Sequence, residues 1–251
     1  MSISAIIITY NEEKNIRDCL ESLKWVNEIV VVDAESEDKT AQIARELGAK
    51  VLSLEWQGYG KQKNYSLSKA TCDWILSLDA DERITPELAE EIQKTLINPS
   101  FSGYEIARKT YFLGKWIRHS GWYPGYVLRL FKREKARFAE KEVHEYIELN
   151  GKVGYLKNHL IHYTDDTLKH YLDKFCNYTS LASKELYANG KRASLLDLSL
   201  RPILFFLKMY FGKCGFLDGI QGFILAILSS FYVFVKYAKL WEKEKEFRDK
   251  K

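Results

Sequence analysis

The sequence WILSLDADE at residues 74–82 joins a short apolar run to a pair of aspartates, Asp79 and Asp81. Continuous apolar runs of this length are typical of strands that are buried on both faces of a sheet. Two runs of the same kind precede it, ISAIIIT at residues 3–9 and EIVVVD at residues 28–33. Segments with helical spacing of apolar residues separate these runs. This alternation predicts an α/β domain with a parallel sheet covered by helices on both faces.

The helices between these runs have signals of their own. Ile16, Leu20 and Leu23 fall on one helical stripe, and Thr85 with Pro86 provides the cap and first turn of a later helix. The same reasoning predicts a strand at residues 50–54 and a helix at residues 61–70.

The second half of the chain has a different pattern of apolar and polar residues. Residues 102–161 are rich in aromatic side chains that alternate with polar ones, which is typical of strands and loops. Beyond Asp165 the apolar spacing becomes helical, and residues 219–235 carry no charge. We therefore expect one domain over residues 1–164, with halves at 1–100 and 101–164, and a helical extension over residues 165–251.

The composition excludes several classes of protein. The 251 residues are 46% hydrophobic and 29% charged, which excludes disordered, collagen-like and disulfide-rich miniproteins. A formal net charge of +4, from 38 basic and 34 acidic side chains, is too balanced to indicate a nucleic-acid partner. Four cysteines lie far apart without a CxxC pair, which argues against a zinc knuckle or a disulfide framework. The first residues lack the pattern of an export signal, so a cytosolic location is expected.

Asp79 and Asp81 are the first candidates for chemistry. Two carboxylates one residue apart at the end of a buried strand can share a divalent cation, and that cation can hold a diphosphate. Mg²⁺ or Mn²⁺ needs only one or two carboxylates when substrate oxygens complete its coordination. The alternative is an acidic turn that caps the next helix, and the two interpretations have roughly equal weight at this point.

The ends of the first two runs add polar side chains at the same edge. Asp33 ends its run and offers a buried acceptor for a base or ribose, although it also suits a helix cap for the segment at Ser36. Thr9, Tyr10 and Glu12 follow the first run and either cradle a nucleoside or cap a helix. Ligands of such sheets bind at the carboxyl ends of the strands.

Five motifs together resemble one family. IIITYNEE, IVVVDAESEDKT, GKQKNYSLSKA, WILSLDADE and the later VHE are similar to those of family 2 glycosyltransferases with the GT-A fold. Within that family the chain is most similar to bacterial lipopolysaccharide core β-1,4-glucosyltransferases. The resemblance implies a Rossmann-like mixed sheet flanked by helices, with a C-terminal helical extension that associates with the membrane.

The resemblance also implies roles for particular residues. It makes residues 1–100 the nucleotide-binding half and residues 101–164 the acceptor and catalytic half. Nucleotide-sugar contacts are assigned to Thr9, Tyr10, Glu12, Asp33, Lys61, Asn64 and Asp79, and the metal to Asp79, Asp81 and His144. Lys63 falls in the same helix as Lys61, and an exposed helix face accounts for either lysine as well as phosphate binding does.

An inverting transfer needs a base that takes the proton of the acceptor hydroxyl. The resemblance places Glu142–Glu145 (EVHE) beside the sugar, and we expect Glu145 to be the base, with Glu142 as the alternative. His144 either completes the metal site or has a structural role, and a histidine is more often structural. In a regular strand, His144 and Glu145 would point to opposite faces, so this assignment requires a turn.

Two further regions suggest an acceptor and a membrane. Aromatic and cationic side chains form a candidate acceptor platform, half of it expected to be core: Trp116, Trp122, Tyr123, Arg118, Arg129 and His119. The uncharged residues 219–235, flanked by lysines, suit a helix lying in the interface of an anionic membrane, a membrane span or a buried oligomer contact.

The resulting expectation is a metal-dependent, inverting hexosyltransferase. The donor is a UDP-sugar, with glucose as the favoured hexose, and the acceptor is a lipopolysaccharide core sugar or another glycolipid at the inner face of the cytoplasmic membrane. The alternatives are another cell-surface polysaccharide glycosyltransferase with a different donor and, from a different class, a non-enzymatic membrane scaffold. A sugar-nucleotide pyrophosphorylase and a haloacid-dehalogenase-type phosphatase fit the motifs less well.

Overall fold

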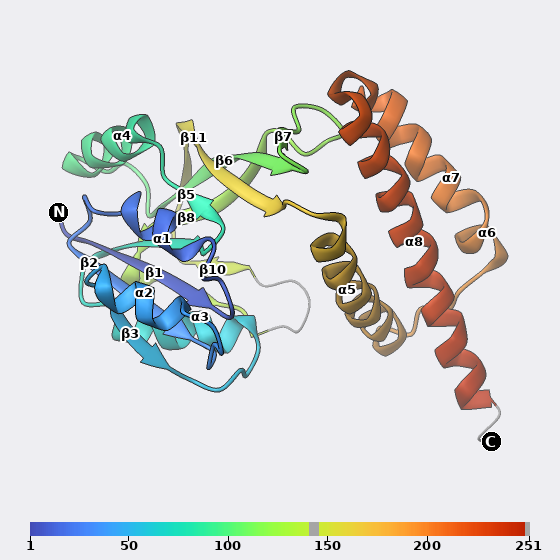
Figure 1. The fold of residues 1–251 in the computed structure, drawn as a ribbon, viewed down its shortest axis with the longest axis horizontal. Helices are drawn as coiled ribbons and strands as arrows, with labels where there is room; N and C mark the ends of the chain where they lie inside the picture. The colour runs from blue at the N-terminus through green and yellow to red at the C-terminus, as the bar shows by residue number, and fades with distance from the viewer. Residues whose placement is uncertain (141–145, 249–251) are drawn as a thin grey trace. The chain divides into compact units, whose positions relative to one another are not determined.

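The computed structural model describes residues 1–140 and 146–248, and the chain divides into two compact units (Figure 1). The first unit comprises Met1–Lys109 and Gly125–Tyr163, and the second comprises Thr110–Pro124 and the chain from Thr164 onward. Residues 110–124 pack with the C-terminal helices. The expected domain bounds, 1–164 and 165–251, stay a prediction.

The first unit contains the predicted parallel strands. They pair in the order β3-β2-β1-β4, with bounds β1 (Ile3–Thr9), β2 (Glu28–Asp33), β3 (Lys50–Ser53) and β4 (Trp74–Asp79). All of these pairings are parallel, which confirms the prediction from the apolar runs. Thr9 pairs with Asp33, and Ile8 pairs with Asp79, so three strand ends meet at one edge of the sheet.

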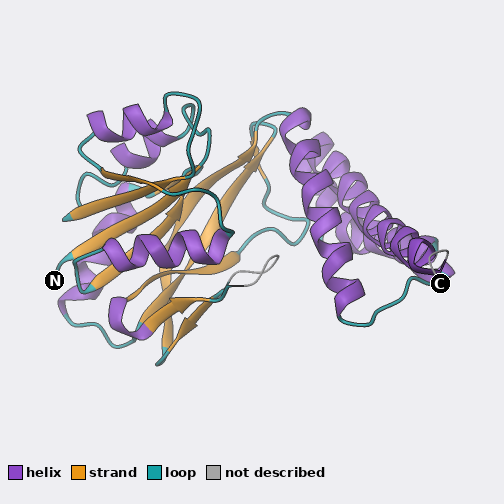
Figure 2. Ribbon diagram, turned by 90° about the horizontal axis from the view of Figure 1, so that it is seen from below, coloured by secondary structure: helices purple, strands orange, loops and turns teal. Residues whose placement is uncertain are grey.

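Antiparallel strands extend this sheet beyond β4. The nine-stranded sheet continues in the order β8-β6-β11-β5, and β7 pairs with β6. Their bounds are β5 (Glu82–Arg83), β6 (Gly103–Phe112), β7 (Lys115–Trp116), β8 (Gly125–Lys132) and β11 (Val153–Asp165). A separate two-stranded sheet is formed by β9 (Ala136–Phe138) and β10 (Ile147–Leu149). Figure 2 shows the strong twist of the main sheet.

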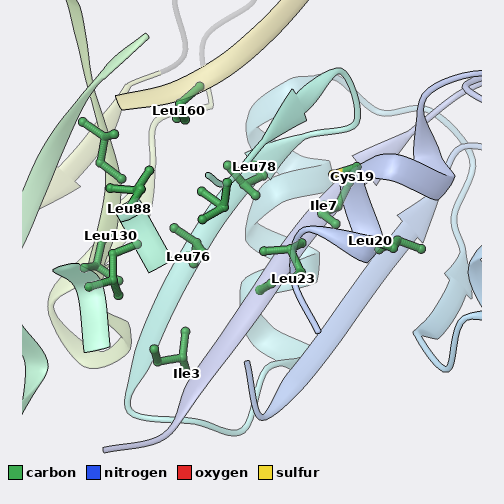
Figure 3. Close-up of a cluster of buried hydrophobic side chains, with 14 of the residues drawn as sticks. Ile3, Ile7, Cys19, Leu20, Leu23, Leu76, Leu78, Leu88, Leu130 and Leu160 are labelled. Carbon is green, nitrogen blue, oxygen red and sulfur yellow. The ribbon is translucent and has the colours of Figure 1, made fainter. Parts of the chain in front are cut away.

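Helices cover both faces of the parallel strands, as the alternating pattern predicts. One buried cluster joins the sheet to α1 (Ile16–Glu21), α2 (Thr40–Glu46) and α4 (Pro86–Ile97), and Figure 3 shows a part of this cluster. A second cluster lies on the other face, beneath α3 (Tyr59–Lys69). Fully buried leucines such as Leu76 and Leu88 stabilise these layers by about 1.5–3 kcal/mol each. The Thr85 side chain accepts a hydrogen bond from Leu88 N, so the predicted cap of α4 is present.

The second unit is built around one long helix. Its helical elements are α5 (Leu168–Ala188), α6 (Leu195–Leu198), α7 (Leu200–Leu207), α8 (Gly219–Arg248) and the turns Lys208–Gly212 and Gly215–Asp218. α5 and α7 both pack against α8, and all three helices are labelled in Figure 1. The uncharged residues 219–235 thus form the first half of α8. This helix is long and apolar enough to cross a membrane, with a mean hydropathy of 1.6 over its most apolar window.

A buried carboxylate fixes the start of α8. Asp218 is 2% exposed and accepts hydrogen bonds from the backbone N–H groups of Arg118 and His119, at 3.1 and 2.9 Å. His119 Nδ1 lies 3.1 Å from the same carboxylate, and the Lys115 ammonium donates to the Asp218 carbonyl at 2.7 Å. The loop after β7 and the start of α8 therefore form one hydrogen-bonded unit.

Candidate active site

Asp79 lies at the centre of a cluster of charges at the end of β4. Lys63 Nζ on α3 is 3.0 Å from one of its carboxylate oxygens, and Arg129 Nη2 on β8 is 2.5 Å from the other. Both cations are buried, and Lys63 is only 3% exposed. The Asp79 side chain itself is 36% exposed, so water screens these ion pairs in part, although less than it screens a pair on the surface.

These contacts determine the ionisation of Asp79. Burial by itself raises the pKa of the Asp79 carboxyl, but the charges of Arg129 and Lys63 outweigh it and hold the pKa far below the ordinary value of 3.8. Asp79 is therefore an anion at every physiological pH, and its two oxygens are engaged by protein cations.

Arg129 also binds the fully buried Glu82. Arg129 Nη2 is 2.7 Å from Glu82 Oε1, and Glu82 Oε2 accepts a hydrogen bond from Asp79 N at 3.1 Å. Burial lowers the pKa of the Arg129 guanidinium, but Asp79 and Glu82 together raise it above its ordinary range. One arginine thus contacts two neighbouring carboxylates, and Lys63 supplies the second positive charge.

Asp81, the second aspartate of the motif, is in a different environment. His162 Nε2 on β11 lies 3.4 Å from Asp81 Oδ2, whereas Oδ1 is buried without a hydrogen-bond partner among the described residues. Burial lowers the pKa of His162, but its contact with Asp81 raises it overall. A buried carboxylate oxygen without a partner is costly, so this atom fits a ligand.

The donor set suits a hard divalent cation. Within residues 1–140 and 146–248, no three His, Cys, Asp or Glu side chains gather into a metal site. A Mg²⁺ or Mn²⁺ bound through one carboxylate and substrate oxygens does not need such a group. Asp81 Oδ1 is available for this role, whereas Asp79 could join only by giving up part of its contact with Lys63 or Arg129.

The side chains after β1 and β2 hold each other in place. Thr9 Oγ1 donates to Asp33 at 3.0 Å, and Asp33 also accepts from Ser36 N and Ser36 Oγ. Asp33 thus holds the turn at Ser36, but it does not cap a helix, because α2 begins at Thr40 without a side-chain cap. The role of Asp33 in nucleotide binding stays a prediction. Tyr10 is 56% exposed, and Glu12 accepts a hydrogen bond from Asn15 Nδ2.

The predicted residues of α3 have different surroundings. Lys61 is exposed, whereas Lys63 is buried against Asp79. Asn64 Nδ2 donates to Phe138 O and its Oδ1 accepts from Phe138 N, both at 2.9 Å. Asn64 therefore ties α3 to β9, and the contact of Lys61 or Asn64 with a nucleotide sugar stays a prediction.

The candidate acceptor platform is divided between the two units. Arg118 lies over the Trp116 ring at 4.2 Å, and Trp116 meets Tyr123 edge to face, all within the second unit. Trp122 packs in the core of that unit beside Phe112, which fits the expectation that part of the set is structural. Arg129 belongs to the first unit and is buried in the Asp79 cluster.

The predicted base lies outside the described residues. Glu142, His144 and Glu145 all fall in residues 141–145, so the base, its alternative, the third metal ligand and the required turn stay predictions.

Sequence analysis did not single out several members of the cluster. Glu82 directly follows the two aspartates, and His162 lies far beyond them in the chain, so no local pattern joins it to Asp81. Arg108 gave no pattern signal, because one arginine on an alternating strand is usually a surface residue. Lys63 lies four residues before Leu67, so the two share one face of the helix, and Leu67 packs in the core. This spacing is the sequence signal that could have indicated a buried Lys63.

Comparison with known proteins agrees with this geometry. Residues 4–161 match the family model "Glycosyl transferase family 2". The chain belongs to family 2 of the glycosyltransferases.

Relatives in this family match almost the whole chain. It is 33% identical to an uncharacterised glycosyltransferase of Rickettsia typhi, over 96% of this chain and 87% of that one. It is 31% identical to the lipopolysaccharide core biosynthesis glycosyltransferase LpsC of Rhizobium meliloti, over 97% of this chain and 93% of that one.

Solved structures confirm the predicted GT-A fold. Staphylococcus aureus TarS (residues 1–349) in complex with UDP-GlcNAc has a TM-score of 0.50, with 17% identity over 98% of this chain and 92% of that one. The TM-score is 0.51 for glucosyl-3-phosphoglycerate synthase of Mycobacterium tuberculosis in complex with Mn²⁺, UDP and glucosyl-3-phosphoglycerate. That protein is 18% identical to this chain, over 77% of this chain and 81% of that one. At these identities the likeness concerns the fold.

Replacing Asp79 should have an effect on stability that depends on pH. Because the folded pKa is depressed, the ionised carboxylate stabilises the fold above the ordinary value of 3.8 and loses this effect as the pH falls below it. We expect Asp79→Asn to lower the free energy of unfolding at pH 7 by about 1–2 kcal/mol and the difference from wild type to narrow at pH 3. Urea unfolding at both pH values measures this.

The exposed Asp73 provides the control. Asp73→Asn should leave the urea midpoint almost unchanged at both pH values. A difference between wild type and Asp79→Asn that is the same at pH 7 and pH 3 would contradict the role of the ionised pair.

Proposed function

We propose that this glycosyltransferase is metal-dependent and inverting, and that it moves a hexose, with glucose favoured, from a UDP-sugar to a lipopolysaccharide core sugar or another glycolipid. The observation that carries the proposal is the end of β4, where Asp79 is neutralised by protein cations and Asp81 keeps a buried oxygen without a partner among the described residues. That difference suits one structural carboxylate and one metal ligand at the site of a diphosphate.

The donor side of the proposal rests on fold and chemistry together. TarS and glucosyl-3-phosphoglycerate synthase share the GT-A fold with this chain, and their structures hold UDP-GlcNAc and UDP with Mn²⁺. In this chain, Thr9, Tyr10, Glu12 and Asp33 follow the neighbouring strands and would contact the nucleoside, with Lys61 and Asn64 on α3. Asp81 would hold the divalent cation, with His144 as a further ligand. The bound cation would stabilise the negative charge of the diphosphate.

The transfer itself needs a base opposite the departing diphosphate. The acceptor hydroxyl oxygen forms a bond to the anomeric carbon while the bond from that carbon to the β-phosphate oxygen breaks. The hydroxyl proton goes to the Glu145 carboxylate, and the electron pair of the broken bond leaves with the diphosphate. Attack from the opposite face inverts the configuration at that carbon.

The acceptor class is supported by the relative LpsC and by the surface of the second unit. LpsC takes part in lipopolysaccharide core biosynthesis, as its name states. Large apolar side chains on the second unit are exposed, and the most exposed of them are Leu195, Leu196, Ile203, Leu204, Phe211, Leu217 and Ile220. Residues 198–241 carry five basic side chains and a single acid, Asp218, which is buried. An apolar face with only cationic exposed charges suits docking at an anionic membrane surface.

The alternatives differ in what the carboxylates do. Another cell-surface polysaccharide glycosyltransferase would use the same site with a different donor, whereas a membrane scaffold would need only the second unit. The buried ion network of Asp79 and Glu82 favours an enzyme, because a scaffold has no use for charged groups buried at this cost.

Titration of UDP tests the donor site directly. We expect wild-type protein to bind UDP more tightly with Mn²⁺ than without it, and Asp81→Asn to lose this enhancement because the variant lacks the carboxylate ligand. The Asp79→Asn, Asp81→Asn double variant should lose metal-dependent binding as well. Isothermal calorimetry measures both, with Asp73→Asn as the control. Failure of folded wild-type protein to bind UDP would contradict the proposed donor.

Replacing the predicted base separates binding from chemistry. We expect Glu145→Gln to bind UDP as the wild type does and to lose transfer by about a hundredfold or more, because the amide cannot accept the proton. Transfer activity and UDP affinity are measured on the same preparation, with Glu142→Gln for comparison. Loss of UDP affinity in Glu145→Gln would contradict its assignment as the base.

Membrane docking is tested with vesicles. Lys208 and Lys213 are exposed beside the apolar face, and each should contribute about 1 kcal/mol at an anionic surface. We expect the double variant Lys208→Gln, Lys213→Gln to sediment about tenfold or more weakly with vesicles of mixed phosphatidylglycerol and phosphatidylcholine. The control is Lys24→Gln, Lys94→Gln, which removes two exposed lysines of the first unit. Equal sedimentation of the two double variants would argue against this docking surface.

A further inference from the structure

Arg108 is a buried cation at the same end of the sheet that the proposed chemistry does not yet use. It lies on β6 opposite Gly125 of β8, and its side chain is partly buried. Its Nε atom is buried and has no hydrogen-bond partner among the described residues. A guanidinium stays charged in proteins, so a buried N–H without a partner is costly.

The acids near Arg108 are engaged by other groups. Asp79, Asp81 and Glu82 all lie within electrostatic range of Arg108. Lys63 and Arg129 form ion pairs with Asp79. Arg129 also pairs with Glu82, and His162 contacts Asp81. The two arginines also repel each other, and burial together with the Arg129 charge lowers the pKa of Arg108. Arg108 is therefore held in place beside acids that bind other cations.

The charges of the cluster indicate what Arg108 is available to bind. Lys63 and Arg129 form ion pairs with the acids of this cluster, whereas Arg108 forms none among the described residues. The Nε atoms of Arg129 and Arg83 also lack a partner there, but both of those guanidinium groups donate to the protein through terminal nitrogens. An anion that enters beside Asp81 thus meets in Arg108 a guanidinium that no acid of the described chain holds. Nε together with one terminal N–H forms a planar fork that matches two oxygens of a phosphate.

We propose that Arg108 binds the diphosphate of the nucleotide-sugar donor through Nε and a terminal nitrogen. This inference rests on the proposed function and adds a phosphate-binding residue from β6, an element outside the nucleotide-binding half expected from the sequence. The diphosphate is favoured over a carboxylate of the acceptor because Arg108 lies in the charge cluster around Asp79 and Asp81, where the diphosphate and its cation would be held.

Comparison of UDP with uridine tests this role, because uridine lacks both phosphates. We expect Arg108→Gln to bind UDP about tenfold or more weakly than wild type, with Mn²⁺ at constant concentration, and to bind uridine with unchanged affinity. The UDP affinity of Arg108→Lys should lie between those of Arg108→Gln and wild type, because an ammonium keeps the positive charge but cannot donate two parallel hydrogen bonds. Arg45→Gln, which removes an exposed arginine of α2, is the control and should match the wild type.

The outcomes separate this inference from the proposed function. Unchanged UDP affinity in Arg108→Gln, or equal losses for UDP and uridine, overturns the role of Arg108 while the donor assignment stands. Absence of UDP binding by wild-type protein removes the donor assignment itself. If thermal unfolding shows that Arg108→Gln does not fold, the UDP and uridine affinities of Arg108→Lys decide, and a loss confined to UDP supports the inference.

Discussion

The contact of Arg129 with both Asp79 and Glu82 is the interaction on which the end of β4 depends. Glu82 is fully buried, and a buried carboxylate without a cation would cost several kcal/mol. Arg129 reaches both acids because β8 runs antiparallel to β4 and pairs Leu130 with Leu76, which puts Arg129 one step nearer to the end of β4. The antiparallel pairing of β8 with β4 thus places Arg129 where it can contact both carboxylates.

The two aspartates of the motif have different surroundings because of this contact. Asp79 anchors Lys63 and Arg129, and these cations bring α3 and β8 to the same strand end. Asp81 faces His162 on β11 and retains a buried oxygen without a partner in the described part of the chain. Two carboxylates that look equivalent in sequence therefore have different environments, because the partners of Asp79 come from α3 and β8 and the partner of Asp81 comes from β11.

Local periodicity accounts for most of the first unit. The apolar runs, the stripe at Ile16 and Leu20 and the Thr85 cap could be predicted because each depends on residues close in sequence. The ion network could not, since Lys63 on α3, Arg129 on β8 and His162 on β11 are all distant from the motif in sequence. Sequence alone also could not tell whether Asp33 binds a ligand or caps a helix, and in the structure it accepts hydrogen bonds from Ser36 in a loop that precedes α2.

The second unit shows how one buried group changes the character of a surface. In sequence, Asp218 is compatible with the polar flank of an interfacial helix. In the structure its carboxylate is buried and accepts hydrogen bonds from the backbone of Arg118 and His119. Its negative charge is therefore buried, and the exposed charges along residues 198–241 are all cationic. The same contact that fixes the start of α8 thus removes the only acid of residues 198–241 from the exposed surface.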